Sequence, residues 1–452
     1  MNPMVVDYRN VPAAFRRLSV PFGVQMLGDQ LLGVVDTIAI GSLGTVALAG
    51  ATAANTVFLT LVFALSGLMT GTSIIAAQRI GGEDVDGFAR TVRAGILGPM
   101  VLAVLCLGLS IPFGSWTLHA IIGGLPSAGP SATYLVLRCA SMIPIAISGT
   151  LIVGLGAAGN RIFGVWTLLV INAVHIPLLL VLALGFGTHH PLGIEGAGWS
   201  SLTSETIGAL YTIAYVARRP AYRIFSSPLA APVAAARLAV RCVVLGLPEA
   251  AFLFAIMLPD VIIVALLAPL GATVISAFRA LNVVSDLTFA IPTPLQSATQ
   301  TVVGQRLGAR DVAGAAWFFD RARRLSFRIT TLSGVIAAAL AWPLAFVFTL
   351  NASVASLAAL PLALHMITLP IKGWAMVSMA PIRASGDTRF SMTVGILCSV
   401  LVIPFAWIGI ERLHIGLYSV PLGWIAAWTA RGLLTEWKLR GGAWMTRAPL
   451  AA

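Results

Sequence analysis

The sequence predicts an all-α membrane protein whose twelve transmembrane helices form two six-helix lobes related by a parallel internal repeat. Two observations lead to this fold class. Hydrophobic residues make up 58% of the 452 residues and charged residues only 10%, with a mean hydropathy of +0.94, which exceeds what a soluble core needs. The chain also matches itself when it is shifted by 227 positions, as Gln78 and Gln305 illustrate (305 − 78 = 227).

The internal repeat extends over most of the chain and needs no gap. Its matching positions include Pro21 and Pro248, Gly44 and Gly271, Asn55 and Asn282, Gln78 and Gln305, Gly81 and Gly308, Asp84 and Asp311, Gly159 and Gly386, and Phe163 and Phe390. An even number of spans in each copy leaves both copies in the same orientation. This arrangement is typical of carriers whose cargo crosses between two lobes.

Six apolar segments in each copy are long enough to cross a bilayer, which takes about 20 helical residues. In the first copy they cover residues 15–41, 46–76, 92–114, 131–155, 162–186 and 195–217. In the second copy they cover residues 239–268, 272–303, 327–349, 354–382, 390–410 and 415–437. A stretch rich in Pro, Ala and Ser lies between the two sets. We therefore expect an N-lobe over residues 1–217, a cytoplasmic inter-lobe connection over residues 218–236 and a C-lobe over residues 237–452.

The net charge of +12 comes from basic residues that alternate with the apolar segments, so we expect no nucleic-acid partner. They lie before the first segment and in even-numbered loops, for example at Arg16, Arg79, Arg161 and Arg324, whereas odd-numbered loops are nearly free of Lys and Arg except for Arg412. By the positive-inside rule, both termini are cytoplasmic. No small-residue cleavage site follows the first apolar stretch, which we interpret as a retained span. We expect a monomer in the lipid bilayer of a bacterial inner membrane.

Patterns typical of enzymes and metal sites do not occur in the sequence. The four cysteines, Cys106, Cys139, Cys242 and Cys398, lie singly in apolar segments without the short spacing of a zinc site. No nucleophile elbow, HExxH or P-loop pattern is present. We therefore expect neither an enzyme nor a bound cofactor or metal.

Several motifs give the chain a family resemblance. They are the stretch from Pro21 through Asp36 to Ser42-Leu43-Gly44, Ala77-Gln78-Arg79-Ile80-Gly81 after the second span, Gly193-Ile194-Glu195-Gly196-Ala197-Gly198 at the sixth, and Gly386-Asp387-Thr388-Arg389-Phe390 after the tenth. Together they resemble the multidrug and toxic compound extrusion (MATE) transporters over essentially the whole chain. The resemblance implies an efflux antiporter whose two lobes enclose a central cavity and rock between inward-open and outward-open states, driven by inward movement of protons or sodium.

The strongest single functional candidate is Asp36, deep in the first span. A charge at membrane depth costs at least about 2.5 kcal/mol and is unlikely to persist without a role. The resemblance implies that Asp36 is the cation-coupling aspartate of the N-lobe. Gain or loss of a proton there would change which packing of the surrounding helices is favoured. Pro21 removes a backbone hydrogen bond from the same helix and is the candidate hinge. The alternative for Asp36 is a structural cap or pairing with a neighbouring polar group.

Other polar residues of the N-lobe are candidates for the same coupling site. Asp29 lies two turns before Asp36 on one helix face, with an ordinary inter-helix hydrogen bond as the alternative. Asn172 resembles the family's N-lobe asparagine, and its amide can donate or accept. His175, almost one turn further, is either a titrating group or a satisfied core histidine. In the sixth span, Ser201, Thr203 and Glu205 supply further oxygens.

The second lobe departs from one branch of the family, which has acidic residues at the positions of Ile256 and Lys372. Coupling through the C-lobe is therefore doubtful. Arg279, Asn282 and Asp286 share one helical stripe, and Asp260 and Lys372 complete a mixed-charge group that we expect to face the cargo cavity. The alternative is a set of structural ion pairs. Met257 and Trp374 are candidates for an adaptable apolar wall, with ordinary packing as the alternative.

The sequence therefore predicts a carrier that exports a small amphipathic organic molecule in exchange for protons. Sodium is the other candidate ion, but the shortage of clustered carboxylates around Asp36 favours the proton. The alternative function is a flippase for a lipid-linked intermediate, with which Lys372 and Arg279 are compatible. Twelve spans without extra lipid-groove helices favour the antiporter.

Overall fold

A computed structural model of the chain describes residues 4–122, 128–187, 191–228, 231–256, 258–349, 351–446 and 450. These residues form helices, turns and short connections and contain no strand. Each of the twelve predicted spans coincides with helix, so the all-α prediction is confirmed. Two predictions concern residues outside the described ranges. They are Met257 and part of the connection over residues 218–236.

The chain divides into two compact units, and each unit contains residues from both halves of the sequence. Unit 2 is Val24–Ala250, and unit 1 combines Ala251–Ala452 with the residues up to Gly23. The first helix, α1 (Val11–Gly41), and the first helix of the second repeat, α8 (Pro232–Ala255), therefore each contribute to both units. The two points of division are equivalent in the repeat, since 250 − 23 = 227.

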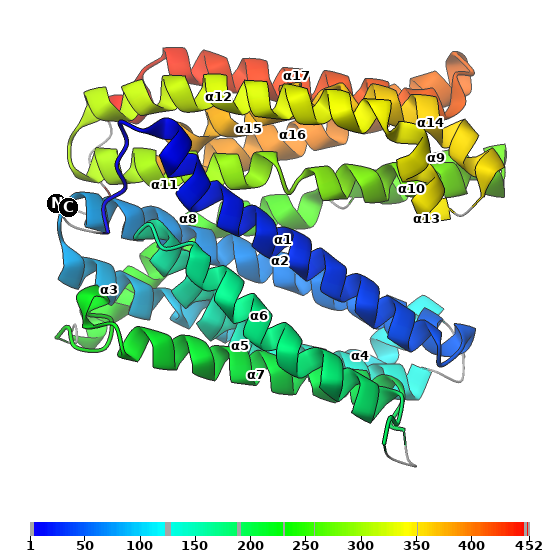
Figure 1. Cartoon of the computed structure of the whole chain (residues 1–452), viewed down its shortest axis with the longest axis horizontal. Coiled ribbons are helices and arrows are strands. Elements are labelled where there is room, and N and C mark those ends of the chain that lie inside the picture. The colour runs from blue at the N-terminus through cyan, green and yellow to red at the C-terminus, as the bar shows by residue number, and fades with distance from the viewer. Residues whose placement is uncertain are drawn as a thin grey trace. The chain divides into compact units, whose positions relative to one another are not determined.

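The helices of unit 2 follow the six predicted spans closely. After α1 they are α2 (Thr45–Gly81), α3 (Val85–Gly95), α4 (Leu97–Ile122), α5 (Ala128–Ala157), α6 (Ile162–Leu178) and α7 (Ile194–Ala217). A π-helical turn, Leu179–Ala183, extends α6, and a short 3-10 turn, Pro220–Tyr222, follows α7. Within this unit α5 packs against α2, α4 and α7, and α6 packs against α7 (Figure 1).

Unit 1 contains more interruptions. Its helices are α9 (Leu258–Leu267), α10 (Ala272–Thr288), α11 (Pro292–Gly308), α12 (Val312–Ala339), α13 (Ala341–Thr349), α14 (Ala352–Met366), α15 (Thr368–Ala384), α16 (Thr388–Trp407), α17 (Ser419–Arg440) and α18 (Ala443–Thr446). Short turns, Ala268–Leu270, Ile408–Arg412 and Gly416–Tyr418, lie between some of them. In Figure 1, α12, α15, α16 and α17 run side by side.

Several spans predicted as continuous are broken in the structure. The span at residues 239–268 is divided between α8 and α9, and the span at 272–303 between α10 and α11. The second break is explained by Pro292 and Pro294, which lack the amide hydrogen that a continuous helix would use. The span at 327–349 is divided between α12 and α13, which meet at 65°. Hydropathy alone did not reveal these breaks, because each segment stays apolar across them.

Nine helices of the described part are long and apolar enough to cross a membrane, and the bent pair α12 and α13 is a tenth. The predicted spans outside this set correspond to α7 and α17, the last long helix of each repeat. Both are less apolar because they contain Ser, Thr and charged side chains, such as Glu205 in α7 and Arg431 in α17. The chain is a multi-pass membrane protein.

Equivalent turns in the two repeats have the same backbone conformation. Asp84 caps α3 by accepting a hydrogen bond from the Gly87 amide, and Asp311 caps α12 by accepting one from the Gly314 amide. The residue before each cap has a positive φ, 61° at Glu83 and 58° at Arg310. Arg79 and Arg306 then pair with the two capping aspartates, at 2.6 and 3.7 Å. The motif around Gln78 and Arg79, which contributes to the family resemblance, therefore stabilises a helix boundary.

Within unit 2, α2 and the first part of α8 approach closely enough for their backbones to touch. A side chain at Gly71 would lie 2.0 Å from the Cys242 carbonyl oxygen, and one at Gly67 would lie 2.3 Å from the Ala250 nitrogen. On α8, Gly246 faces the backbone of Leu68 equally closely. This is the small-residue packing by which helices associate in lipid, where hydrophobic burial provides little driving force.

We predict that Gly71→Val destabilises the protein by about 1–3 kcal/mol or more, because the added methyl groups push α8 away from α2. The measurement is thermal unfolding of the purified protein in detergent. Gly108→Val in α4 is the matched control, since nothing lies within 4 Å of a side chain at that position. Equal unfolding temperatures for the two variants would contradict this account of the α2–α8 contact.

Candidate functional site

Asp36 lies on α1 and makes a direct bond to His175 of α6. The distance from the His175 Nε2 to the Asp36 Oδ1 is 2.7 Å, and the two side chains are 3% and 20% exposed. A bond to an ionised partner is among the stronger hydrogen bonds in proteins. It relieves the cost of holding a carboxylate within a membrane-spanning helix. The sequence predicted both residues, and the structure brings them together.

Ser204 of α7 extends this contact to a third helix. The other ring nitrogen of His175, Nδ1, lies 3.3 Å from the Ser204 Oγ, and the Ser204 hydroxyl also lies 3.0 Å from the Ser201 carbonyl oxygen. A hydroxyl has a single proton to donate. When it donates to the carbonyl, it can accept from a protonated Nδ1, and when it donates to Nδ1, the imidazole is neutral. The chain from Asp36 through His175 to Ser204, here called the Asp36–Ser204 relay, can therefore hold a proton or release it.

Asn172 lies three residues before His175 on α6, so the two share a helix face. Its Oδ1 is buried and accepts no hydrogen bond among the described residues. An unpaired buried acceptor costs about 1–3 kcal/mol. The atom is therefore suited to a donor that is present only part of the time, such as a protonated carboxyl.

Glu205 and Asp29 form the acidic surroundings of the relay. Glu205, next to Ser204 on α7, interacts electrostatically with His175 and with Arg138 of α5. Asp29 on α1 interacts electrostatically with Glu205. Thr203 lies on the same helix but has no hydrogen bond to this group among the described side chains. The structure thus brings Asp29 and Glu205 to the group and leaves Thr203 outside it.

Two members of this group, Ser204 and Arg138, were missed in the sequence. Ser204 is one of many hydroxyl residues in α7, and nothing local distinguishes it. Arg138 could have been found, because it is a single arginine within the apolar segment 131–155 and the argument used for Asp36 applies to it equally. Its guanidinium lies 3.8 Å from the centre of the Phe58 ring and 3.5 Å from the Asn55 Oδ1.

The second mixed-charge group lies in unit 1. Asp260 of α9 accepts a hydrogen bond from Asn282 of α10 and interacts electrostatically with Asp286 and Arg279 of the same helix. These four residues were predicted as neighbours, and the structure brings them together. Arg279 and Asp286 are exposed on the surface of the unit, whereas Asn282 and Asp260 are partly buried.

Lys372 of α15 is 1% exposed and lies among aromatic rings. Its Nζ is 3.8 Å from the centre of the Phe289 ring and 5.7 Å from that of Trp428. It interacts electrostatically with Asp286, but no carboxylate of the described residues lies within 4 Å of its Nζ. Trp374, on the same helix, packs against Gly432 of α17. Among the described residues, Lys372 therefore does not form the tight structural ion pair that was the alternative to a cargo-facing position.

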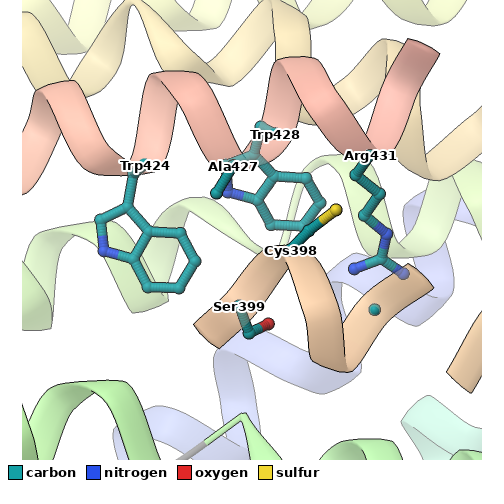
Figure 2. Close-up of a pocket in the computed structure, with 7 residues that line it drawn as sticks. Cys398, Ser399, Trp424, Ala427, Trp428 and Arg431 are labelled. Atoms are coloured by element: carbon teal, nitrogen blue, oxygen red, sulfur yellow. The ribbon is translucent and has the colours of Figure 1, made fainter. Parts of the chain in front are cut away.

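A narrow cleft lies beside Trp428 between α16 and α17. It is lined by Gly395, Cys398, Ser399, Trp424, Ala427, Trp428 and Arg431. Figure 2 shows the Arg431 guanidinium and the Trp428 indole side by side along α17, facing Cys398 and Ser399 of α16. Arg431 lies 5.1 Å from the centre of the Trp428 ring, so Trp428 has one cation close to it from α15 and another from its own helix.

A comparison with protein families finds one family whose model matches two ranges that together cover most of the chain. The family model described as MatE matches residues 21–181 and again residues 248–408. The chain belongs to the MatE family. Both matches are separated by the repeat offset (248 − 21 = 227 and 408 − 181 = 227), so the internal repeat and the family domain are the same unit. Membership of this transporter family makes the chain a membrane transporter.

Relatives and solved structures agree with the MatE assignment. The chain is 25% identical over 406 residues to the "Probable multidrug resistance protein NorM" of Caulobacter vibrioides, covering 86% of this chain and 83% of the relative. It is 22% identical to the multidrug resistance protein MdtK of Edwardsiella ictaluri, covering 82% and 81%. An outward-facing multidrug resistance MATE transporter of the MOP superfamily has the same fold, with a TM-score of 0.87, 19% identity and 98% coverage of both chains.

A second solved structure has the same fold with different reported pocket chemistry. It is a MOP superfamily transporter from Pyrococcus furiosus, described as having a binding pocket of reverse polarity that suggests a different function. Its TM-score is 0.86 at 20% identity over 98% of both chains. At this identity the likeness establishes the MatE fold of our chain. The residues of the pocket must be argued from this sequence itself.

We predict that His175→Leu lowers the free energy of unfolding by about 1.5–3 kcal/mol, because the Asp36 carboxyl group loses its hydrogen-bond partner. Ser204→Ala should cost only about 0.5–1 kcal/mol, since it removes a longer hydrogen bond that does not involve a carboxyl group. Thermal unfolding of both variants in detergent measures the difference. Equal losses would indicate that Asp36 finds another partner when His175 is absent.

Proposed function

We propose that this MatE protein exports small amphipathic organic compounds from bacteria, across the inner membrane, in exchange for protons. Two lobes would alternate between states open to either side. The relatives from Caulobacter vibrioides and Edwardsiella ictaluri, which are named as multidrug resistance proteins, support export of drug-like cargo. The basic residues in even-numbered loops support cytoplasmic termini.

The observation that carries this proposal is the Asp36–Ser204 relay. Three membrane-spanning helices of unit 2 each contribute one of its groups, Asp36 from α1, His175 from α6 and Ser204 from α7. Binding a proton to the relay changes which of these bonds can form. The relative energy of the helix packings then depends on the proton, which is the requirement for coupling proton movement to a conformational change.

The relay favours protons over sodium ions. A sodium ion is bound by oxygen lone pairs, but the nearest neighbour of Asp36 is a ring nitrogen at 2.7 Å. An imidazole can bind a proton and cannot donate a lone pair to sodium while its Nε2 hydrogen faces the carboxylate. The orphan Oδ1 of Asn172 provides an acceptor for the proton that arrives.

Helix α1 provides a route from the relay to the rest of the protein. It contains both Asp29 and Asp36, and it contributes to both units, changing from one to the other just after Pro21, at Gly23. Because Pro21 cannot donate a backbone hydrogen bond, bending there breaks fewer bonds than elsewhere in the helix. We propose Pro21 as the hinge that responds to the charge of Asp36.

Charged groups of unit 1 are our candidates for contact with cargo. Arg279 and Asp286 are exposed on α10, a helix of membrane-spanning character, and charges facing hydrocarbon are costly. They should therefore face an aqueous cavity. Both signs of charge are present on this helix, and Asp260 and Lys372 belong to the same group. Such a mixed-charge group is suited to zwitterionic as well as charged amphipathic molecules.

We predict that Asp36→Asn lowers proton-driven transport at least about tenfold while the protein still inserts and folds, because an amide cannot take up the proton. The measurement is ethidium transport by purified protein in liposomes with an imposed pH difference. Asp320→Asn is the control, since Asp320 is an exposed carboxylate that pairs with Arg323 and Arg324 on its own helix.

Normal transport by Asp36→Asn under the proton gradient would refute the relay as the coupling site. A second comparison concerns the class of function. Cells that express the wild-type protein should accumulate less ethidium, and an uncoupler should abolish the difference. If expression leaves ethidium and antibiotic accumulation unchanged, a flippase for a lipid-linked intermediate becomes the better explanation.

A further inference from the structure

Arg138 is a permanent positive charge placed within the acidic group around the relay. It projects from α5, a helix that packs against α2, α4 and α7. Arginine stays protonated at every physiological pH. Its guanidinium contacts the Phe58 ring and the Asn55 Oδ1, and its Nε is buried without a hydrogen-bond partner in the described part of the chain. The proposed proton exchange does not use this residue.

The titratable groups around Arg138 come from every neighbouring helix of the relay. Glu205 of α7 interacts electrostatically with it, as does Tyr134, one turn earlier on α5. Tyr134 also interacts with Asp36 of α1, and Glu205 interacts with Asp29 of α1 and His175 of α6. No described carboxylate lies within 4 Å of the guanidinium. Arg138 thus adds positive charge to the whole acidic group instead of neutralising one member of it.

The internal repeat shows that Arg138 occupies a defined position. Shifted by 227, Arg138 coincides with His365 and Phe58 with Ser285. In unit 1 the His365 Nε2 lies 2.8 Å from the Ser285 Oγ, so the equivalent pair is in contact there as well. Both lobes therefore place a basic side chain against the second helix of the repeat. Only in unit 2 is that side chain permanently charged, and unit 2 contains the relay.

A fixed positive charge such as that of Arg138 acts differently on protons and on metal cations. A sodium ion would have to add its charge to an acidic group that already interacts with a guanidinium, and the Asn55 oxygen accepts a hydrogen bond from Arg138. A proton that binds an ionised carboxylate forms a covalent bond and leaves a neutral group. The repulsion from Arg138 therefore weakens proton binding but prevents a sodium site from forming.

We propose that Arg138 is the ion-selectivity residue of unit 2: its fixed positive charge disfavours a sodium ion beside the acidic group and thereby restricts coupling to protons. This inference rests on the proposed role of Asp36 in ion coupling. It predicts that removing the charge turns a site that excludes sodium into one that binds it.

The test is binding of radioactive sodium to the purified full-length protein in detergent, which requires no knowledge of the cargo. Wild-type protein should bind sodium no better than a protein-free control. Arg138→Gln should bind it at least about tenfold more tightly at pH 8, where few protons compete with sodium. Adding Asp36→Asn to Arg138→Gln should remove the gain, because the carboxylate that holds the ion is then absent.

Two controls separate loss of charge from loss of structure. Arg138→Lys keeps the charge without the planar guanidinium and should continue to exclude sodium. Arg321→Gln removes an arginine that lies 3.9 Å from the Trp317 ring of α12, a contact much like that of Arg138 with Phe58, and should not gain sodium binding. If Arg138→Gln does not yield folded protein, Arg138→Met offers an uncharged chain of similar length.

Either of two results would overturn the inference: sodium binding by the wild-type protein, or folded uncharged variants at position 138 that still do not bind sodium. These results are separate from the fate of the proposed function. Failure of wild-type protein to transport ethidium with a pH difference would count against the antiporter and would leave the sodium-binding result interpretable. Proton-driven transport together with unchanged sodium exclusion in Arg138→Gln would count against Arg138 alone.

Discussion

The bond between Asp36 and His175 is the interaction on which the N-lobe depends. A carboxylate within a membrane-spanning helix needs a donor, and here the donor is a ring that is itself able to bind a proton. Because α1, α6 and α7 all contribute to the relay, the same bonds that make the buried charge tolerable also join three helices. In the proton-coupled mechanism that we propose, stability and proton sensitivity therefore have a common origin.

Polar residues and glycines set the helix arrangement where hydrophobicity cannot. Most of the described helices are apolar, so apolar surface alone does not select partners in lipid. The close approach of α2 and α8 at Gly67 and Gly71 and the capped turns at Asp84 and Asp311 supply that selection. The capped turns occur in both repeats with the same backbone conformation. The chemistry differs, as the pairs Arg138–Phe58 and His365–Ser285 demonstrate.

Sequence alone predicted the features that depend on local composition or on the repeat. Fold class and the repeat followed from hydropathy and from the offset of 227. The cost of a buried charge singled out Asp36 as the coupling candidate, which stays a prediction. The choice between a titrating and a satisfied His175 could not be made, because it depends on a residue 139 positions away that turned out to be Asp36 itself. Ser204 was missed since only tertiary contact distinguishes it from its neighbours. The breaks at Pro292 and between α12 and α13 were masked by continuous apolar composition.

The division of α1 and α8 between the two units has a consequence for biosynthesis. Unit 1 requires the first turns of α1 and also Ala251–Ala452, and the residues Val24–Ala250 are synthesised between these two parts. Translation proceeds at roughly 5–20 residues per second, so those first turns wait many seconds inside the membrane for their partners. During that interval an early helix has one end without its final neighbours. Its arginine-flanked beginning, at Arg16 and Arg17, is suited to hold it at the lipid headgroups until the rest of the chain arrives.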